Sequence, residues 1–317
     1  MKESVLMILG NGFDLDLGLK TSYKDFVESR LLPKSGECAL FDRICKKYKE
    51  KLWIDVEEEL KGMATEKFTV RRMDENGTDE AYPNLVGEYK ALVQELSEYI
   101  KGIDYESIKK DSTAAKVIRH VLAYSESYKV IDFNYTDINT IAQKIGWSKN
   151  IPCKHIHGEV LSDSIIVGFD DDVDLLRDEY CQMIKSHSEH FRSVNINEAL
   201  ETATEVIFFG HSLGSTDYHY FSDFFLSQVK EIDSEKYNKK IIRIFTYDEA
   251  ARQNILLQLR NMNNKKTTLL YDLNDFQIYR TALEYTKDHQ AIDEYCNVLK
   301  RRAANRRNAR AMLGSLP

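Results

Sequence analysis

The sequence predicts an α/β fold with a Rossmann-like, mostly parallel sheet, and three observations support this prediction. Short apolar runs typical of buried strands alternate with longer helical segments, which is the order found in parallel sheets. A mostly helical stretch at about 36–125 follows the first strand, so we expect a large helical insertion there. The chain ends in a helix with a basic tail at 276–317. We therefore expect a Rossmann-like domain at 1–275 followed by this C-terminal segment.

The expected elements follow the chain in order. The first strand is Val5–Leu9, a continuous apolar run typical of a strand buried on both faces. A helix with Thr21 or Ser22 as its cap is expected at Thr21–Arg30. Further helices are expected at 38–50, 55–65, 84–100, 112–125, 137–146, 172–203, 217–230, 248–260 and from 271 to about 299. Further strands are expected at 128–133, 153–157, 165–169, 205–209, 240–246 and 267–270, and a polar loop at 73–83.

The composition is that of a folded, acidic protein. The 317 residues are 43% hydrophobic with only 4 prolines, which is enough apolar material for a sizeable core. Lys and Arg number 44 against 51 Asp and Glu, a net charge of −7, which disfavours a nucleic-acid partner. The exception is the basic run at 301–310, which would bind an anionic partner or simply form a solvated helix end.

The cysteines and the N-terminus indicate a cytoplasmic protein. Five cysteines, none in a CxxC pair, form no disulfide framework and encode no zinc ribbon. Unpaired thiols are typical of a reducing compartment. The apolar run Val5–Leu9 is far shorter than the ~20 residues of a membrane-spanning helix, and no signal-peptide cleavage site follows it. We therefore expect no membrane association.

The first stretch with candidate chemistry is GNGFD at 10–14, directly after the first strand. Its two glycines are typical of a loop that lets backbone amides approach a phosphate. The third glycine of the dinucleotide fingerprint is replaced by Leu15, and no Gly-Lys-Ser/Thr of a P-loop follows. Tight turns after strands use glycine anyway, so the stretch indicates a generic phosphate loop and no more.

Two further stretches lie at the ends of predicted strands. Asn134 would present its amide to the crevice at the carboxyl edge of the sheet, or would merely turn the chain into the next helix. His155 and His157 would lie on one face of their strand. An imidazole there would act as a general base, hold a metal, or be a hydrogen-bonded structural side chain.

The fourth stretch, GHSLG at 210–214, contains the G-x-S-x-G pattern of a nucleophile elbow. An elbow needs a helix directly after the nucleophile, here Ser212, whereas capping residues at 215–217 place the helix start later. The triad would need Asp248 or Asp272 with His289, which falls within a predicted helix. A serine hydrolase is therefore the least favoured alternative.

In this order the stretches resemble the AbiH family, associated with bacteriophage abortive infection. They are the segment from Gly10 to Phe26, Asn134-Tyr135, His157-Gly158 and Gly210-His211-Ser212-Leu213, and Trp53–Glu57 looks like the family's Trp-x-Asp-x-Glu element. The resemblance spans residues 4–225 or so. The family in turn resembles the SIR2-like fold, which binds NAD. The resemblance implies an anti-phage abortive-infection protein that hydrolyses NAD to nicotinamide and ADP-ribose.

The resemblance also implies a site. Asn134 would orient the nicotinamide ribose or the attacking water, and His157 would be the general base. The implied cofactor-binding residues are Gly10, Asn11, Gly12, Phe13, Asp14, Gly210, His211, Ser212 and Asp217. Asp14 or Asp137 would stabilise the cationic ribose.

Three departures from the SIR2 pattern limit what is implied. Asn11 replaces a small residue beside the pyrophosphate, and Thr136 stands where the pattern has Asp. The paired CxxC zinc motifs of the deacylases are absent. We therefore expect neither deacylation nor zinc.

Two alternatives of other classes stay open. One is a nucleotide-sensing module without turnover. The other is a metal-dependent nuclease or nucleotide hydrolase, with ligands among His155, His157, Asp14, Asp16 and Glu57. The expected partners are a small nucleotide and, because such an activity must be silent before infection, a homo-oligomer or a partner protein of the defence system.

Overall fold

A computed structural model describes residues 3–29, 38–51, 55–65, 84–230 and 239–314. The chain forms two compact units. Unit 1 comprises Met1–Leu19, Asp104–Ile156 and Val194–Pro317. Unit 2 comprises Lys20–Ile103 and His157–Ser193.

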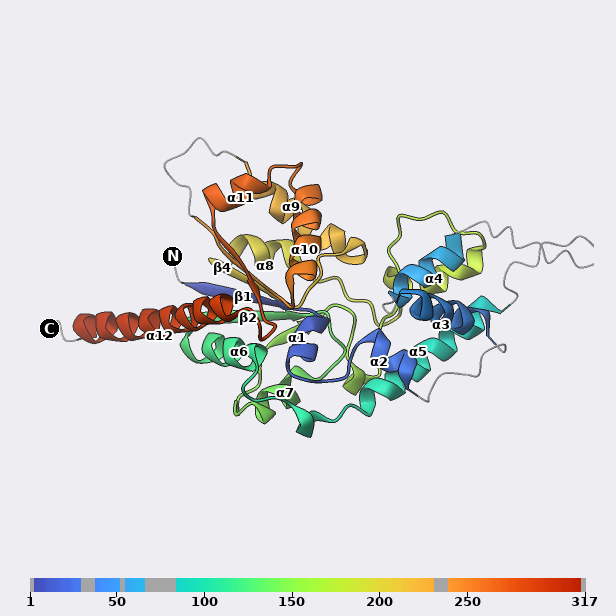
Figure 1. The fold of residues 1–317 in the computed structure, drawn as a ribbon, viewed down its shortest axis with the longest axis horizontal. Helices are drawn as coiled ribbons and strands as arrows, with labels where there is room; N and C mark the ends of the chain where they lie inside the picture. Colours follow the sequence, from blue (N-terminus) through green and yellow to red (C-terminus); the bar gives the residue numbers. More distant parts are fainter. Residues whose placement is uncertain (1–2, 30–37, 52–54, 66–83, 231–238, 315–317) are drawn as a thin grey trace, which may run out of the picture. The chain divides into compact units, whose positions relative to one another are not determined.

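Unit 1 is built on a six-stranded parallel sheet in the order β3-β2-β1-β4-β5-β6, which confirms the predicted α/β fold (Figure 1). The strands are β1 (Ser4–Leu9), β2 (Ser127–Asp132), β3 (Cys153–His155), β4 (Glu205–Phe209), β5 (Ile241–Thr246) and β6 (Asp275–Arg280). This is the order of the dinucleotide-binding Rossmann fold. The direction of winding reverses between β1 and β4, and ligands of such sheets bind outside the carboxyl ends of the strands at that reversal.

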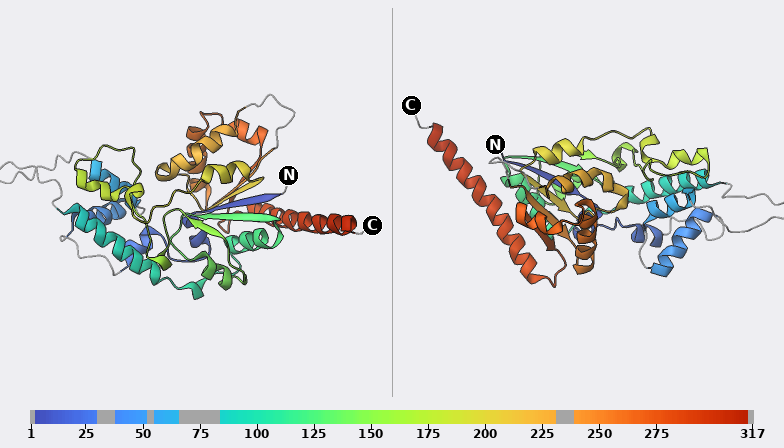
Figure 2. Two further views of the ribbon diagram at one scale, coloured as in Figure 1. Left: turned by 180° about the vertical axis from the view of Figure 1, so that it is seen from behind. Right: turned by 90° about the horizontal axis from the view of Figure 1, so that it is seen from above.

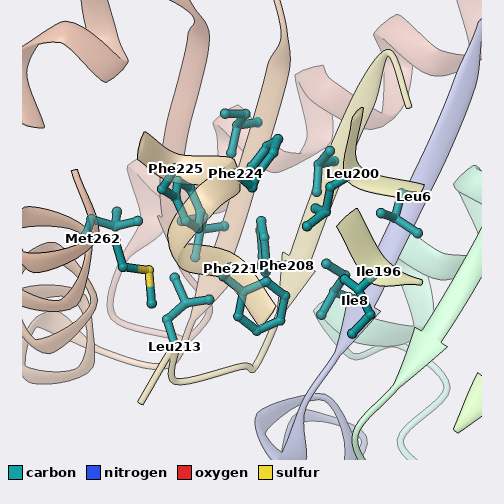
Figure 3. Close-up of a cluster of buried hydrophobic side chains, with 14 of the residues drawn as sticks. Leu6, Ile8, Ile196, Leu200, Phe208, Leu213, Phe221, Phe224, Phe225 and Met262 are labelled. Carbon is teal, nitrogen blue, oxygen red and sulfur yellow. The ribbon is translucent and has the colours of Figure 1, made fainter. Parts of the chain in front are cut away.

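The central strands are apolar on both faces because unit 1 packs helices on both faces. All five residues of β4 are buried. On one face, Phe208 of β4 packs against Phe221 and Phe225 in a large apolar cluster (Figure 3). On the other face, Phe209 stacks on Phe245.

Several helices of unit 1 begin where a short polar side chain accepts backbone N–H groups. Ser112, Asp137 and Asp248 each cap the helix that follows, and the caps at Asp137 and Asp248 were predicted. The helices are α1 (Asn11–Asp16), α6 (Thr113–Tyr124), α7 (Ile138–Lys144), α8 (Ile196–Thr202), α9 (Tyr218–Ser227), α10 (Glu249–Met262), α11 (Thr267–Leu273) and α12 (Thr286–Gly314), with short 3-10 turns η1 (Tyr105–Ser107) and η5 (Ser215–Asp217).

Over its described residues, unit 2 has α-helices in its first segment and short 3-10 turns joined by irregular chain in its second segment. Its helices are α2 (Tyr23–Glu28), α3 (Ala39–Lys51), α4 (Val56–Thr65) and α5 (Leu85–Lys101), with 3-10 turns η2 (Val160–Ser162), η3 (Asp178–Met183) and η4 (Lys185–His187) (Figure 2). Ser22, one of the two caps predicted for this helix, caps α2, and it forms a capping box with Asp25. The Tyr89 hydroxyl of α5 donates to the Val167 carbonyl at 2.9 Å and so fixes the second segment of the unit on the first.

Several predicted elements are wrong. No strand forms at 165–169, where Phe169 makes only an isolated bridge to Ile184. The stretch 172–203 is not one helical region: within it the Ser188 hydroxyl accepts the His190 N–H at 3.3 Å, a local turn that competes with a helix, and only α8 is α-helical. The stretch 267–270 belongs to helix α11. The last strand is β6, which interrupts the helix that was expected from 271 to about 299.

Two further predictions concern the GNGFD stretch and two segments that lie outside the described residues. The GNGFD stretch was expected as a loop, but α1 begins within it at Asn11. The expected loop 73–83 and Trp53-Ile54 of the Trp-x-Asp-x-Glu element lie outside the described residues. No helix in the described ranges is both long enough and apolar enough to cross a membrane.

The basic run at 301–310 is part of α12, and its charge is largely balanced within unit 1. Arg302 lies 3.1 Å from the fully buried Glu205, which also accepts the Tyr295 hydroxyl at 2.6 Å. Arg306 pairs with Glu3, and Arg310 pairs with Glu126 at 2.6 Å. These contacts join α12 to the rest of unit 1, so the basic run has a structural role.

Asp16, at the end of α1, makes the stability of unit 1 depend on pH. Its Oδ2 accepts the Ala114 N–H at 2.7 Å. Burial raises the pKa of this carboxyl above its ordinary 3.8, although the bond from Ala114 acts in the opposite direction. Because the folded pKa is the higher one, the folded chain binds more protons in the window above 3.8. The free energy of unfolding therefore falls as pH rises through that window.

We predict that the Asp16→Asn variant has a higher free energy of unfolding than the wild type at pH 7. The gap between the two free energies should narrow as pH is lowered toward 3.8. Urea unfolding at several pH values measures it. Asp111→Asn, in an exposed turn, shows what the loss of a negative charge does by itself. A wild type that is the more stable of the two at pH 7 would contradict the argument.

Candidate functional site

Three glycines bring the turn after β1 and the turn after β4 into backbone contact. Gly10 N–H donates to the Phe209 carbonyl at 3.0 Å, and Gly12 N–H donates to the Gly210 carbonyl at 2.9 Å. A Cβ on Gly12 would lie 2.6 Å from Gly210 Cα. One on Gly210, whose φ is +66°, would lie 2.2 Å from the nitrogen of Phe13. Packing at the β1/β4 reversal therefore requires glycine at these positions.

The same contact uses the amides that a phosphate loop would offer. Besides Gly10 and Gly12, Phe13 N–H donates to the Gly10 carbonyl at 2.8 Å, and the Phe13 ring is fully buried against Phe209. In this conformation the N–H groups of Gly10, Gly12 and Phe13 are used within the protein. Asn11 and Ser212 are exposed polar side chains of the two turns.

A buried carboxylate connects the ends of β1 and β2. Asp14, only 1% exposed, accepts the Thr136 hydroxyl at 2.9 Å and the Asn134 amide Nδ2 at 3.3 Å. Nδ2 also donates to the Gly10 carbonyl at 3.2 Å. Asn134 therefore does more than turn the chain, because its amide group is held in one orientation by groups from the first turn. Thr136, which departs from the SIR2 pattern, is part of this set.

The backbone of Asn134 is held as well. Its N–H donates to Asp132 at 2.9 Å, and its carbonyl oxygen lies 3.2 Å from Nδ1 of His155. Neither Asp132 nor this pairing was predicted from the sequence. The turn that carries Asn134 is thus fixed at side chain and backbone alike.

Asp137 has a capping role. Its carboxylate accepts the N–H groups of Asn139 at 2.9 Å and Thr140 at 3.1 Å, at the start of α7. Its own N–H donates to the Tyr105 hydroxyl at 3.0 Å. Burial raises the pKa of Tyr105 to about 12, so this hydroxyl stays protonated at neutral pH. Of the two carboxylates considered for stabilising a cationic ribose, Asp14 is the one bonded to Asn134.

His211 lies in the apolar core after β4. It is 4% exposed, and its ring packs edge-on against Phe133 with 4.5 Å between centroids. Its Nδ1 accepts the Leu213 N–H at 3.0 Å, so the ring proton is on Nε2, 3.5 Å from an Asp217 oxygen. His211 and Asp217 thus pair with each other and shape the turn that exposes Ser212.

The turn at Ser212 does not have the geometry of a nucleophile elbow. Helix α9 begins only at Tyr218, and positive φ falls at Gly210 and at Leu213, at +54°, rather than at Ser212. His289 lies in α12, where Nε2 is 3.2 Å from the Ala282 carbonyl. These contacts agree with the low rank of the serine-hydrolase alternative.

His157 lies in unit 2 beside a buried ion pair. Lys185 Nζ is 3.0 Å from Glu57 Oε2 and 3.3 Å from His157 Nε2, and the Lys185 and Glu57 side chains are 5% and 9% exposed. Glu57 also accepts the Gly168 N–H at 3.3 Å. A protonated ammonium only donates, so His157 Nε2 accepts and its Nδ1 carries the proton.

The predicted pair of histidines is divided between the two units. Strand β3 ends at His155, so the expected strand to 157 is wrong, and alternation along one strand does not relate the two rings. The His155 ring nitrogen Nδ1 lies against the Asn134 carbonyl, whereas the His157 ring nitrogen Nε2 lies against Lys185. Sequence reasoning missed Lys185 because no motif contains it.

We predict that Lys185→Met destabilises unit 2 by about 3–5 kcal/mol, because it removes the ammonium from a buried carboxylate. Adding Glu57→Gln should recover most of the loss. Lys101→Met is the matched control, since it removes a lysine from the exposed pair with Asp163 in the same unit and should cost no more than about 1 kcal/mol. Urea unfolding followed by hydrogen exchange at 157–193 measures the effect. Equal losses for the two lysine variants would contradict a buried pair.

Comparison with known proteins agrees with the predicted resemblance. The family model described as Bacteriophage abortive infection AbiH matches residues 6–237. The match begins in β1 and extends past α9, so it includes all the glycine, Asn134 and His157 positions described above. A search of curated proteins found no match. Because the family match covers well over half of the chain, the protein belongs to the AbiH family of bacteriophage abortive-infection proteins.

Proposed function

We propose that this abortive-infection protein hydrolyses NAD to nicotinamide and ADP-ribose. The observation that supports the proposal most is the fixed amide of Asn134. It lies at the carboxyl end of β2, beside the β1/β4 reversal where sheets of this order bind nucleotides. The family role in phage defence is consistent with such chemistry, since loss of NAD arrests an infected cell.

The proposed hydrolysis needs only a few side chains of the protein. Water attacks C1′ of the nicotinamide ribose as the bond to the ring nitrogen breaks, and nicotinamide leaves with the electron pair. The proton lost by the water goes to a base. In the proposal Asn134 binds a ribose hydroxyl or the water, and the buried negative charge of Asp14 behind it stabilises the cationic ribose. Asn11 and Ser212 bind the pyrophosphate in place of the bonded glycine amides.

The proposal assigns the general base to His157 of unit 2. A base needs an available lone pair, and in the structure the lone pair on Nε2 faces Lys185. His157 can accept a proton only after this contact is given up. An enzyme that is silent in this conformation and active after infection fits the biology of abortive infection.

The same contact favours a second candidate, a nucleotide sensor without turnover. If Lys185 stays in contact with Nε2 of His157, this nitrogen cannot act as the base. The protein would then bind the nucleotide and release it unchanged. The metal-dependent hydrolase receives less support, because Glu57 and His157, two of its suggested ligands, lie against an ammonium that would repel a metal ion.

The test is release of nicotinamide from NAD by the full chain, purified from resting and from phage-infected cells. We expect release by an activated preparation, and a rate lowered ~10²–10⁴-fold by His157→Ala and strongly reduced by Asn134→Ala. His120→Ala, a half-buried histidine of α6 bonded to its own helix, should keep full activity.

Two results would separate the candidates. Intact NAD recovered from every preparation, with tight binding, would favour the sensor. If cells that carry the Asn134→Ala variant and cells that carry the His157→Ala variant are both still protected against phage, the proposed site is overturned.

A further inference from the structure

Three side chains of metal-binding type share one face at the β3 edge of the sheet in unit 1. In the β2–β3 ladder Asp132 is the partner of His155, and Val130 is the partner of Cys153. Alternate residues of a strand point to the same face, so Cys153 and His155 lie on one side together with Asp132. A carboxylate oxygen, the thiol sulfur and a ring nitrogen all lie within 4.8 Å of one another.

The donor set suits zinc. Tetrahedral zinc with bonds of about 2.0–2.3 Å places its ligand atoms about 3.3–3.8 Å apart, so small side-chain rotations would close the cluster around an ion. One thiolate, one imidazole and one carboxylate form a mixed set of the borderline-soft kind that zinc accepts. Three protein ligands leave a fourth position for water.

The surroundings support a ligand role for His155. Its Nδ1 lies 3.2 Å from the Asn134 carbonyl, and a hydrogen bond donated there leaves the lone pair on Nε2. Metal-binding histidines are commonly oriented by such a bond to a carbonyl. Asp132 is 1% exposed, whereas Cys153 and His155 are only half-buried on an edge strand, which gives an ion a way in from solvent.

We propose that Asp132, Cys153 and His155 bind one zinc ion, with water as the fourth ligand. The proposal does not depend on NAD chemistry. Its consequence is local: Asp132 and His155 are bonded to the N–H and the carbonyl of Asn134, so a bound ion stabilises the turn that carries this residue. No zinc was expected from the sequence because paired CxxC motifs are absent. The sequence alone does not reveal that Asp132 and Cys153 lie close together in the fold.

Metal titration of the full chain tests the site. After dialysis against chelator, zinc is titrated in competition with a chromophoric chelator, and cobalt is used to detect thiolate coordination. We expect one equivalent of tightly bound zinc. Cys153→Ser and His155→Gln should each weaken binding at least tenfold. Cys45→Ser, a half-buried thiol of α3, should leave binding unchanged.

A second measurement needs no variant. Iodoacetamide labelling of wild type, read by peptide mass spectrometry, should be slowed by zinc at Cys153 and not at Cys45. No saturable zinc binding, zinc binding that survives both ligand variants, or labelling of Cys153 that zinc does not slow would each overturn the proposal. Rapid labelling of Cys153 without any zinc effect would indicate a thiol–imidazole pair instead.

Discussion

The buried carboxylate of Asp14 is the interaction on which the carboxyl edge of the sheet depends. A carboxylate taken out of water is costly unless it is hydrogen-bonded, and here Thr136 and Asn134 provide the bonds. Asn134 also binds the Gly10 carbonyl, and the glycine contact joins the same turn to Gly210 after β4. The ends of β1, β2 and β4 are therefore fixed to one another. The proposed nucleotide site needs this rigidity, because an amide orients a ribose only if it is itself oriented.

The buried polar groups of unit 2 have a different character. There a lysine lies between a carboxylate and the imidazole proposed as the base. Hydrogen bonds in unit 1 fix the surface that we propose binds the nucleotide, whereas the Lys185 contact in unit 2 occupies the atom that we propose as the base. The proposed hydrolase would have to be harmless until infection, and occupation of the proposed base would be a physical way to achieve this.

Local patterns predicted the parts of the structure that local physics decides. The continuous apolar runs of β1 and β4 and the caps at Ser22, Asp137 and Asp248 follow from burial and from side chains that bind nearby amides. The sequence also indicated turns at the glycines. It did not indicate that the two turns pack on each other, with the N–H groups of Gly10 and Gly12 bonded to carbonyls of the other turn. Lys185 was not predictable, since its partners Glu57 and His157 are distant in the chain. Helix α11 was missed because a short apolar run fits a strand or a helix equally well.

The central claim is that the carboxyl edge of the sheet in unit 1 binds a nucleotide through Asn134. Calorimetric titration of NAD into the purified full chain tests it most directly, because binding is measured whether or not turnover follows. The account predicts saturable binding at one site, weakened at least tenfold by Asn134→Ala. Asn263→Ala, which removes another buried asparagine of unit 1, should leave the affinity unchanged. No binding to folded wild type, or equal affinities for wild type and Asn134→Ala, would contradict the account.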